Sequence, residues 1–387
     1  MRALTLLPCR FWGGPEKQTV QLATWLRENR HAETILAVMP HDAGPVDENP
    51  LVVHARGEGL EVTPFLMKRR YDLFEGRRLL RDLVRRYRPD VVWATGYKAD
   101  VLTASLDRVP TVAMLRGWTA EDAKVRFFEW LDRRTLRRLD AIAVVSQVLR
   151  ERAIREGAKP ERVFWVPNAI DSSRLPQRWS RGDLCREAGL DPDRPIIGAV
   201  GRLSPEKGHR ILLEAFRSVR QRIPGAQLVL VGDGPEELSL RRQADHLGLS
   251  DCTSFMGLRQ DGQQIIGTLD VMALPSFSEG MPNVVLEAFA YGTPVVATAV
   301  GGVPEMVEHA RSGWVVPAGD PSRLAQALTE ALGDRQEAQR RARGAHETLK
   351  ATFTVERQAA AWMRATETAM ASKGTDGPVP GEIRPGG

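Results

Sequence analysis

Two glutamates, Glu279 and Glu287, have the types and spacing of a ligand site. Glu279 lies among turn-forming residues, with Gly280 and Pro282 after it, whereas Glu287 lies in a helix predicted to begin at Asn283 and to stop at Gly292. The amides of residues 283–285 would be unpaired at that helix start and would attract an anion. The pattern indicates a ligand with hydroxyl groups around a negative charge; the alternative is two surface glutamates beside a core helix.

A second loop supplies positive charge. The segment 201–208 follows a predicted strand at 196–200, and Gly201 allows the chain to turn tightly there. Arg202 and Lys207 project from this loop, and two cations near a helix start suit a diphosphate. The Gly-Lys-Ser/Thr order of a P-loop is missing. Ordinary surface Arg and Lys side chains would give the same pattern.

Two further glycine turns follow strands predicted at 227–231 and 253–256. Glycine at these places would let a flat ligand, such as a nucleobase, approach the backbone. Ordinary turns have the same composition. The candidate base contacts are Gly232, Asp233, Gly234, Leu258 and Arg259.

The elements that must position these residues alternate between strands and helices, which predicts an α/β fold with doubly wound parallel sheets. In such sheets ligands bind at the carboxyl ends of the strands. The 387 residues and the number of strands favour two sheets in two domains. The predicted strands are 4–7, 34–39, 90–94, 111–115, 141–145 and 163–166, then 196–200, 227–231, 253–256, 271–274, 294–297 and 313–316.

Turn-forming residues between 171 and 194 predict the domain boundary. The expected domains are 1–170 and 171–351, with a helix at about 352–370 that returns to the first domain. Residues 371–387 are rich in Gly and Pro and nearly free of apolar side chains, so we expect a disordered tail.

The motifs together resemble the donor site of retaining family 4 glycosyltransferases, which have the two-domain GT-B fold with Rossmann-like domains facing across a cleft. The resemblance covers all of the chain except the tail. The matching segments, in the family's order, are Phe11-Trp-Gly-Gly-Pro-Glu-Lys-Gln, Val166-Pro-Asn-Ala-Ile-Asp, Gly201-Arg-Leu followed by Glu-Lys-Gly208, Gly232-Asp-Gly-Pro, Glu279 to Glu287, Gly292-Thr-Pro-Val-Val-Ala and Gly301-Gly-Val-Pro-Glu.

The resemblance implies a role for each of these positions. Arg202 and Lys207 would bind the donor diphosphate, Glu287 the nucleotide ribose and Glu279 the donor sugar. Gly13 and Gly14 would let the N-terminal domain close over the diphosphate. The backbone that touches sugar and phosphates would come from Gly280, Met281, Pro282, Asn283, Val284 and Val285.

The resemblance also implies the chemistry. Such enzymes cleave the bond between the anomeric carbon and phosphate with retention, by a front-face mechanism that needs no protein nucleophile, no metal and no cofactor. The catalytic demand is then to stabilise the departing diphosphate, which falls on Arg202, Lys207 and the helix start. Asp191-Pro-Asp193 matches an Asp-x-Asp metal pattern, but its place before a strand predicts a turn.

The chain departs from the family on the acceptor side. Many relatives carry His-Gly after the strand equivalent to 111–115, where this chain has Arg116-Gly117-Trp118, and a second common His is replaced in 93–98. Arg116 would bind an anionic acceptor or donor group, mark weakened activity, or form a buried salt bridge at the domain interface. All three alternatives are open.

Charge and composition limit where in the cell the protein is expected to be. Residues 68–88 hold nine basic and three acidic residues, and 76–88 has the period of an amphipathic helix, which suits an anionic membrane surface or an ordinary solvated helix face. No aromatic interleaving favours nucleic acid. The sequence shows no long apolar run, no signal peptide and no paired cysteine spacing. We expect a cytoplasmic protein, peripheral on the inner face of the membrane.

The leading hypothesis is a glycosyltransferase that moves a sugar from a UDP-, GDP- or ADP-linked donor to a glycan or lipid-linked acceptor of the cell envelope. One alternative is a sugar-nucleotide epimerase or phosphorylase on the same fold, which the lack of histidines in the acceptor-side loops disfavours. Another is a non-catalytic relative that binds a nucleotide sugar. A dehydrogenase is disfavoured because no Gly-x-Gly-x-x-Gly follows the first strand.

Overall fold

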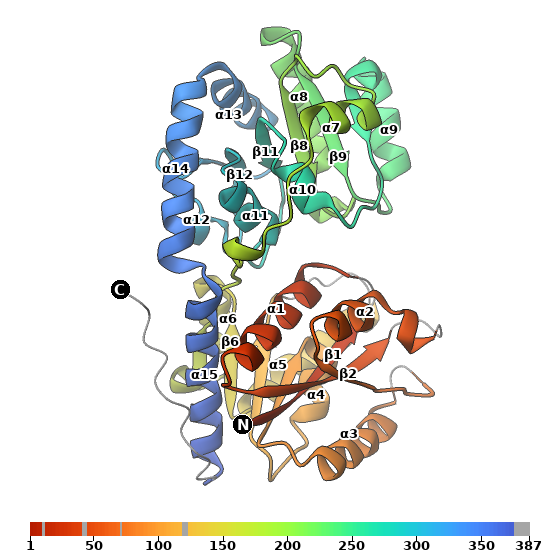
Figure 1. Cartoon of the computed structure of the whole chain (residues 1–387), viewed down its shortest axis with the longest axis vertical. Coiled ribbons are helices and arrows are strands. Elements are labelled where there is room, and N and C mark those ends of the chain that lie inside the picture. The colour runs from red at the N-terminus through yellow and green to blue at the C-terminus, as the bar shows by residue number, and fades with distance from the viewer. Residues whose placement is uncertain (10–11, 41–44, 70–71, 118–122, 375–387) are drawn as a thin grey trace. The chain divides into compact units, whose positions relative to one another are not determined.

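The computed structural model describes residues 1–9, 12–40, 45–69, 72–117 and 123–374, in two compact units. The first contains residues up to Ala169 and the helix α15 (Val355–Ser372), and the second contains Ile170–Thr354 (Figure 1). The expectation of a tail from residue 371 is corrected at its start, since Ala371 and Ser372 end α15. Residues 375–387 lie outside the described ranges.

The described part of the first unit contains a seven-stranded sheet with the order β3-β2-β1-β4-β5-β6-β7, in which every neighbouring pair is parallel. Its strands are β1 (Arg2–Cys9), β2 (Glu33–Pro40), β3 (Glu61–Pro64), β4 (Val91–Thr95), β5 (Thr111–Leu115), β6 (Ala141–Val144) and β7 (Val163–Trp165). The sequence analysis missed β3, because this edge strand has a single buried residue, Thr63, and ends in proline.

Helices cover both faces of the first sheet, which explains why its central strands are mostly apolar on both faces. Leu4 and Leu6 of β1 pack with Leu80 on one face, and Leu7 and Cys9 pack toward Val20 on the other. The helices are α1 (Gly14–Glu28), α2 (Pro50–Gly57), α3 (Leu73–Tyr87), α4 (Tyr97–Thr103), α5 (Ala123–Thr135), α6 (Gln147–Arg155) and α15.

The second unit contains, in its described residues, a six-stranded parallel sheet with the order β10-β9-β8-β11-β12-β13. Its strands are β8 (Ile196–Val200), β9 (Gln227–Val231), β10 (Thr253–Phe255), β11 (Val271–Leu274), β12 (Val295–Thr298) and β13 (Trp314–Val316). Its helices are α7 (Arg181–Ala188), α8 (His209–Arg222), α9 (Glu237–His246), α10 (Gly262–Ile266), α11 (Asn283–Tyr291), α12 (Val303–Met306), α13 (Pro321–Gly333) and α14 (Arg335–Thr352). The predicted doubly wound parallel architecture is confirmed for both sheets.

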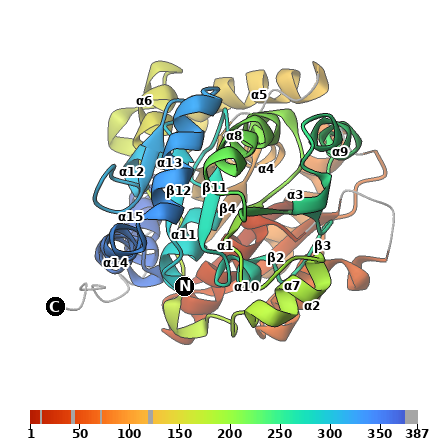
Figure 2. The same ribbon diagram turned by 90° about the horizontal axis from the view of Figure 1, so that it is seen from above.

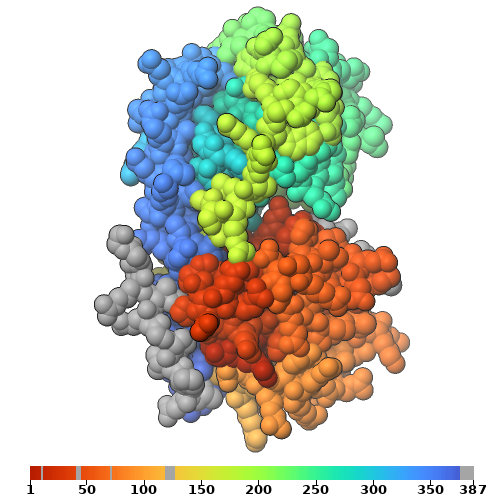
Figure 3. Space-filling model, viewed as in Figure 1, coloured from red at the N-terminus to blue at the C-terminus, as the bar shows by residue number. Residues whose placement is uncertain are grey.

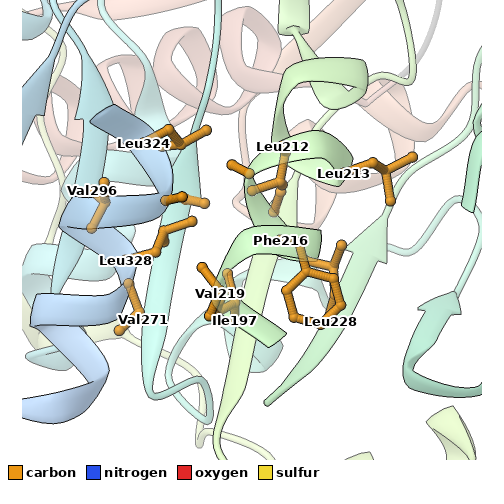
Figure 4. Packing of buried hydrophobic residues seen from close by; sticks show 14 of the residues in the cluster. Ile197, Leu212, Leu213, Phe216, Val219, Leu228, Val271, Val296, Leu324 and Leu328 are labelled. Carbon is orange, nitrogen blue, oxygen red and sulfur yellow. The ribbon is translucent and has the colours of Figure 1, made fainter. Parts of the chain in front are cut away.

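The core of the second unit lies between its sheet and the pair α8 and α13, which lie side by side (Figure 2). Phe216 of α8 lies beside Leu228 of the sheet and Val219 beside Ile197, and Leu212 belongs to the same buried cluster (Figure 4). These positions recur with the helical period, so one face of α8 is buried and the opposite face is polar. The packing fixes where α8 begins, directly after the loop 201–208.

The basic helix α3 packs its apolar face onto the core of the first unit. Leu80 is fully buried, and Leu83 and Val84 pack against the same cluster. Asp72 accepts hydrogen bonds from the amides of Phe74 and Glu75 and so begins the helix one turn earlier than predicted. The apolar side of this helix is therefore not available to a lipid surface. Arg70 and Tyr71, within the predicted basic stretch, lie outside the described ranges.

Across the described residues, each helix is too short or too polar to serve as a transmembrane span.

A matched pair of leucines tests the core of the second unit. Leu212 is fully buried and Leu238 is 72% exposed. We expect Leu212→Ala to lower the free energy of unfolding by about 2–5 kcal/mol, because it leaves a cavity. Leu238→Ala should change it by less than about 0.5 kcal/mol. Equilibrium urea unfolding of the two variants measures the difference, and equal losses would show that α8 does not pack as described.

Candidate functional site

The loops at the carboxyl end of the second sheet are joined by backbone hydrogen bonds. The Gly201 amide donates to the Val231 carbonyl at 2.9 Å, and the Leu203 amide donates to the Asp233 carbonyl at 2.7 Å. The Gly232 amide in turn donates to the Gly257 carbonyl at 2.8 Å. The loops after β8, β9 and β10, which the sequence analysis singled out one by one, therefore form a single rim.

The loop after β11 joins the same rim. The Phe277 amide donates to the Glu206 carbonyl at 2.7 Å, and the Gly302 amide donates to the Gly280 carbonyl at 2.9 Å. Backbone bonds of this kind hold loops in place without using side chains, so the side chains remain available for a ligand.

Two glycines make this close approach possible. Gly208 has φ 67° and Gly301 has φ 52°, both in the left-handed region that other residues avoid. A Cβ at position 208 would collide with the carbonyl oxygen of Pro275, and one at position 301 with that of Glu279. Any side chain at either place would push the loop after β11 away from its neighbours.

Lys207 and Glu279 meet across this junction. Lys207 Nζ lies 2.7 Å from Glu279 Oε1, and the Ser276 hydroxyl donates to the same oxygen at 2.6 Å. The Glu279 side chain is 7% exposed and that of Lys207 is 27% exposed. The sequence analysis placed these two residues on one ligand but did not predict that they pair. The pair holds a partly exposed ammonium at the rim against a largely buried carboxylate.

Arg202 lies at the start of the same loop and is partly buried. Its carbonyl lies 3.2 Å from Nε2 of His209, the first residue of α8. His209 is 2% exposed, and burial is the main cause that lowers its pKa to about 4. At neutral pH the ring is uncharged, and with its proton on Nε2 it donates to Arg202. The sequence analysis missed His209; its place directly after Gly208 was the available signal.

The helix α11 begins at Asn283 and ends at Gly292, which has φ 71°, as predicted. Met281 and Pro282 are buried before it, whereas Asn283 and Val284 are partly exposed. The expectation that the amides of residues 283–285 are all unpaired is wrong for Val285, whose amide donates to the Pro282 carbonyl at 3.2 Å. Because the first turn is tight, the Val285 amide is paired within the chain and is not available to an anion.

Glu287 lies in the second turn of α11 and is 8% exposed. Burial and then the negative charge of Glu287 raise the pKa of Tyr291 to about 12. The Tyr291 hydroxyl donates to the Pro176 carbonyl at 2.6 Å. Both predicted glutamates are therefore largely buried side chains, which excludes the alternative that they are ordinary surface residues.

The candidate base contacts divide into two groups. Leu258 is 70% exposed on the rim, and Asp233 is exposed there too. The Arg259 side chain is instead held by Glu187 and by Asp261, the latter at 2.8 Å, and lies 4.9 Å from the ring centre of Trp179. Figure 3 shows the segment 175–190, coloured yellow-green, on the surface of this unit. Arg259 thus anchors that segment with its side chain.

Arg116 lies in the first unit and is held by α1. Its Nη1 donates to the Pro15 carbonyl at 2.8 Å, and its Nη2 donates to the Thr19 hydroxyl at 3.1 Å. Burial lowers the pKa of Arg116 to about 10, while the nearby Glu16 charge opposes that shift. Both of these hydrogen-bond partners belong to its own unit. Trp118, next to it in the motif, lies outside the described ranges.

Gly13 and Gly14 form the start of α1, with Gly13 as its N-cap. The Gly13 amide donates to Glu16 Oε2 at 3.1 Å, so this amide already has a partner. The closure of these glycines over a diphosphate stays a prediction. Phe11, at the start of the same motif, lies outside the described ranges.

The described residues hold no group of three or more His, Cys, Asp or Glu side chains arranged for a metal ion. The Asp191-Pro-Asp193 segment is a turn, as predicted, because Asp191 accepts a hydrogen bond from the Asp193 amide at 3.0 Å and pairs with Arg194 at 2.9 Å.

Two family models match the chain over most of its length. The model described as Glycosyltransferase Family 4 matches residues 12–174, and the model described as Glycosyl transferases group 1 matches residues 194–334, which include the rim and α11. The chain belongs to glycosyltransferase family 4. Lys207, Glu279 and Glu287 thus lie within the matched second half.

Curated relatives agree with this membership. The chain is 35% identical over 220 residues to the GDP-mannose-dependent alpha-(1-6)-phosphatidylinositol monomannoside mannosyltransferase of Mycobacterium tuberculosis, a match that covers 53% of this chain and 57% of that protein. It is 29% identical over 277 residues to the lipopolysaccharide core biosynthesis glycosyltransferase LpsE of Rhizobium meliloti, covering 72% and 75%. The chain therefore spans little more than half the length of the mannosyltransferase.

Solved structures show the same fold. The Anabaena protein HepE in complex with UDP-glucose has a TM-score of 0.81 at 24% identity, covering 96% of this chain and all of that chain. The lipopolysaccharide glycosyltransferase WaaG has a TM-score of 0.71 at 17% identity, covering 97% and 100%. The family 4 chain described here has the GT-B fold.

The buried His209 predicts a loss of stability in acid. Its pKa in the folded state, about 4, lies below the ordinary value of 6.5, so as the pH falls the unfolded chain takes up the proton first. Its contribution is complete above pH 6.5 and falls by about 3 kcal/mol toward pH 4. We expect urea unfolding of His209→Gln to depend less steeply on pH in that window than the wild type. The exposed His246→Gln is the control, and an unchanged slope for His209→Gln would contradict the account.

Proposed function

We propose that this family 4 chain is a retaining glycosyltransferase that moves a sugar from a nucleotide-diphosphate donor to a glycan or lipid-linked acceptor. The observation that carries the proposal is the Lys207–Glu279 pair, at 2.7 Å, held at the rim beside the start of α11. Such a rim offers a cation, helix amides and carboxylates within one set of loops, which is what a sugar diphosphate requires.

The chemistry follows from where charge develops. When the bond between the anomeric carbon and the phosphate oxygen breaks, negative charge grows on the diphosphate, and Arg202, Lys207 and the α11 start stabilise it. Glu279 holds the Lys207 ammonium in position and accepts a hydrogen bond from a donor-sugar hydroxyl. Glu287 accepts hydrogen bonds from the ribose hydroxyls. The acceptor hydroxyl oxygen then bonds to the same face of the anomeric carbon that the phosphate leaves and passes its proton to the departing phosphate oxygen. No metal takes part.

The relatives support the choice of donor and acceptor. HepE was solved with UDP-glucose, and the Mycobacterium relative is named as GDP-mannose-dependent, so UDP- and GDP-sugars come before ADP-sugars. The relatives named for phosphatidylinositol mannoside and for lipopolysaccharide core synthesis support a glycan or lipid-linked acceptor in the cell envelope. Arg116 lies on the proposed acceptor side.

A matched pair of arginines tests the leaving-group role. We expect Arg202→Ala to lower kcat for donor turnover by about 10²–10³-fold, because it removes a charge that stabilises the departing diphosphate. Arg210→Ala is the control, since Arg210 pairs with Glu236 at 2.7 Å on the surface of α8. Steady-state release of the nucleotide diphosphate measures both. Equal activity of the two variants would contradict the role, and donor binding without turnover by the wild type would favour a non-catalytic relative.

The stereochemistry and the metal requirement form a second test. The anomeric proton of the fresh product, observed by NMR, should show the configuration of the donor sugar. Chelation of divalent metals should leave the rate unchanged, because fixed cations do the work that a metal would do. Inversion of configuration, or loss of activity that added metal restores, would overturn the front-face mechanism proposed here.

We also propose that the basic segment 68–88 lies on an anionic membrane surface. The exposed side chains include Lys68, Arg78, Arg81 and Arg85, next to Phe74, which is 85% exposed. Because the other apolar side chains of α3 pack on the core, Phe74 would be the apolar side chain that contacts the lipid. The exposed cations would bind the anionic headgroups.

Vesicle sedimentation checks this surface. Phe74→Ser should weaken binding to phosphatidylglycerol vesicles several-fold, since an aromatic ring leaves the interface. Phe127→Ser is the control, because Phe127 is 55% exposed elsewhere on the same unit. Equal binding of both variants, or equal binding to uncharged vesicles, would contradict the proposal.

A further inference from the structure

The interior of the first unit contains a small cavity that the proposed transfer reaction does not use. Its volume is about 20 Å³, enough for one water-sized species. It is lined by residues of β1, β4, β5, α1 and α15 and by Arg116 after β5. Elements distant in the sequence therefore meet around it.

Four residues that line this cavity carry buried hydrogen-bond donors without a partner in the described chain. Among the described residues, Trp93 Nε1, Trp362 Nε1 and Arg116 Nε are buried and have no hydrogen-bond partner, and the same holds for the Thr5 hydroxyl. Trp93 and Trp362 are each 3% exposed, and their rings meet edge to face with centroids 5.3 Å apart. A buried donor without a partner loses its hydrogen bond to water and gains none in the protein, so a cluster of such donors favours binding of an acceptor.

The remaining polar side chains of the lining are threonine hydroxyls. Thr19 accepts from Arg116 and donates to the Pro15 carbonyl at 2.9 Å, and Thr95 donates to the Leu6 carbonyl at 3.2 Å. The described lining residues include no carboxylate and no carboxamide. The residues that line the cavity therefore carry three buried N–H groups without a partner in the described chain, one of them on a guanidinium, and few acceptors.

We propose that this cavity binds a single monoatomic anion of the halide class, such as chloride. An anion accepts from every donor that lines the cavity, whereas a water molecule accepts from two and must direct its own hydrogens to acceptors. The anion also compensates the positive charge of Arg116, a partly buried side chain whose Nε is buried and whose charge Glu16 offsets only in part. The anion would join β4, α15 and Arg116, the residue that follows β5. This inference is independent of the proposed transferase activity.

Anomalous diffraction from crystals of the full chain grown in sodium bromide gives the direct test. We expect one bromide peak in the cavity, within hydrogen-bond reach of the Trp93 and Trp362 indole nitrogens. A water molecule that persists there in bromide, or no bromide peak in the cavity, would overturn the proposal.

Thermal unfolding in sodium chloride and in sodium gluconate at matched ionic strength gives an independent test. Near saturation, chloride should raise the Tm of the first unit by about 3 °C, because it binds the folded state only. Trp93→Phe keeps the ring and removes the N–H, so it should abolish the rise. Trp165→Phe is the matched control, since its buried indole N–H also lacks a partner in the described chain but does not line the cavity.

The outcomes separate the proposal from its alternatives. A chloride effect of equal size in Trp93→Phe would contradict the site, as would no chloride effect in the wild type. If Trp93→Phe does not fold, Trp362→Phe takes its place, and the bromide experiment on the wild type decides the question without any variant.

Discussion

The carbonyl oxygen of Pro275 occupies the space where any side chain at position 208 would begin, and the carbonyl of Glu279 does the same at position 301. Because both positions are glycines, the loop after β11 approaches the loops after β8 and β12 backbone to backbone. Lys207 and Glu279 meet as a result of that approach, and α11 starts immediately beyond it. The position of the candidate site thus depends on the contact between these loops more than on any one charged residue.

The contact between these loops holds the Lys207 ammonium in a fixed position against Glu279. Glu279 is largely buried, so removing Lys207 would leave its carboxylate with the Ser276 hydroxyl as its remaining hydrogen-bond partner among the contacts described above. A fixed ammonium needs no reorganisation when negative charge appears on a leaving group, which is the property that electrostatic catalysis requires. His209 adds a neutral contact to the Arg202 carbonyl without adding charge of its own at neutral pH.

Much of this could be predicted from sequence because parallel strands buried on both faces are apolar throughout, as in β8 and β11. The start and the end of α11 could also be predicted from sequence, since Pro282 and Gly292 flank the helix. Strand β3 could not be predicted because its pairing with β2, and not its own side chains, makes it a strand. The Lys207–Glu279 pair depends on two loops 72 residues apart, which no local pattern encodes. The ion pair between Arg259 and Glu187 could not be predicted either, because the two residues are far apart in the sequence.

The proposed function requires that the rim of the second unit bind a nucleotide sugar through Glu287 and the loops around it. Calorimetric titration of the wild type and Glu287→Gln with UDP-glucose, GDP-mannose and ADP-glucose tests it most directly, with Glu237→Gln on the surface of α9 as the control. The account predicts that one donor binds the wild type and the control, and that Glu287→Gln weakens this binding tenfold or more, about 1.4 kcal/mol. Absence of binding by all three donors, or equal binding by Glu287→Gln, would contradict it.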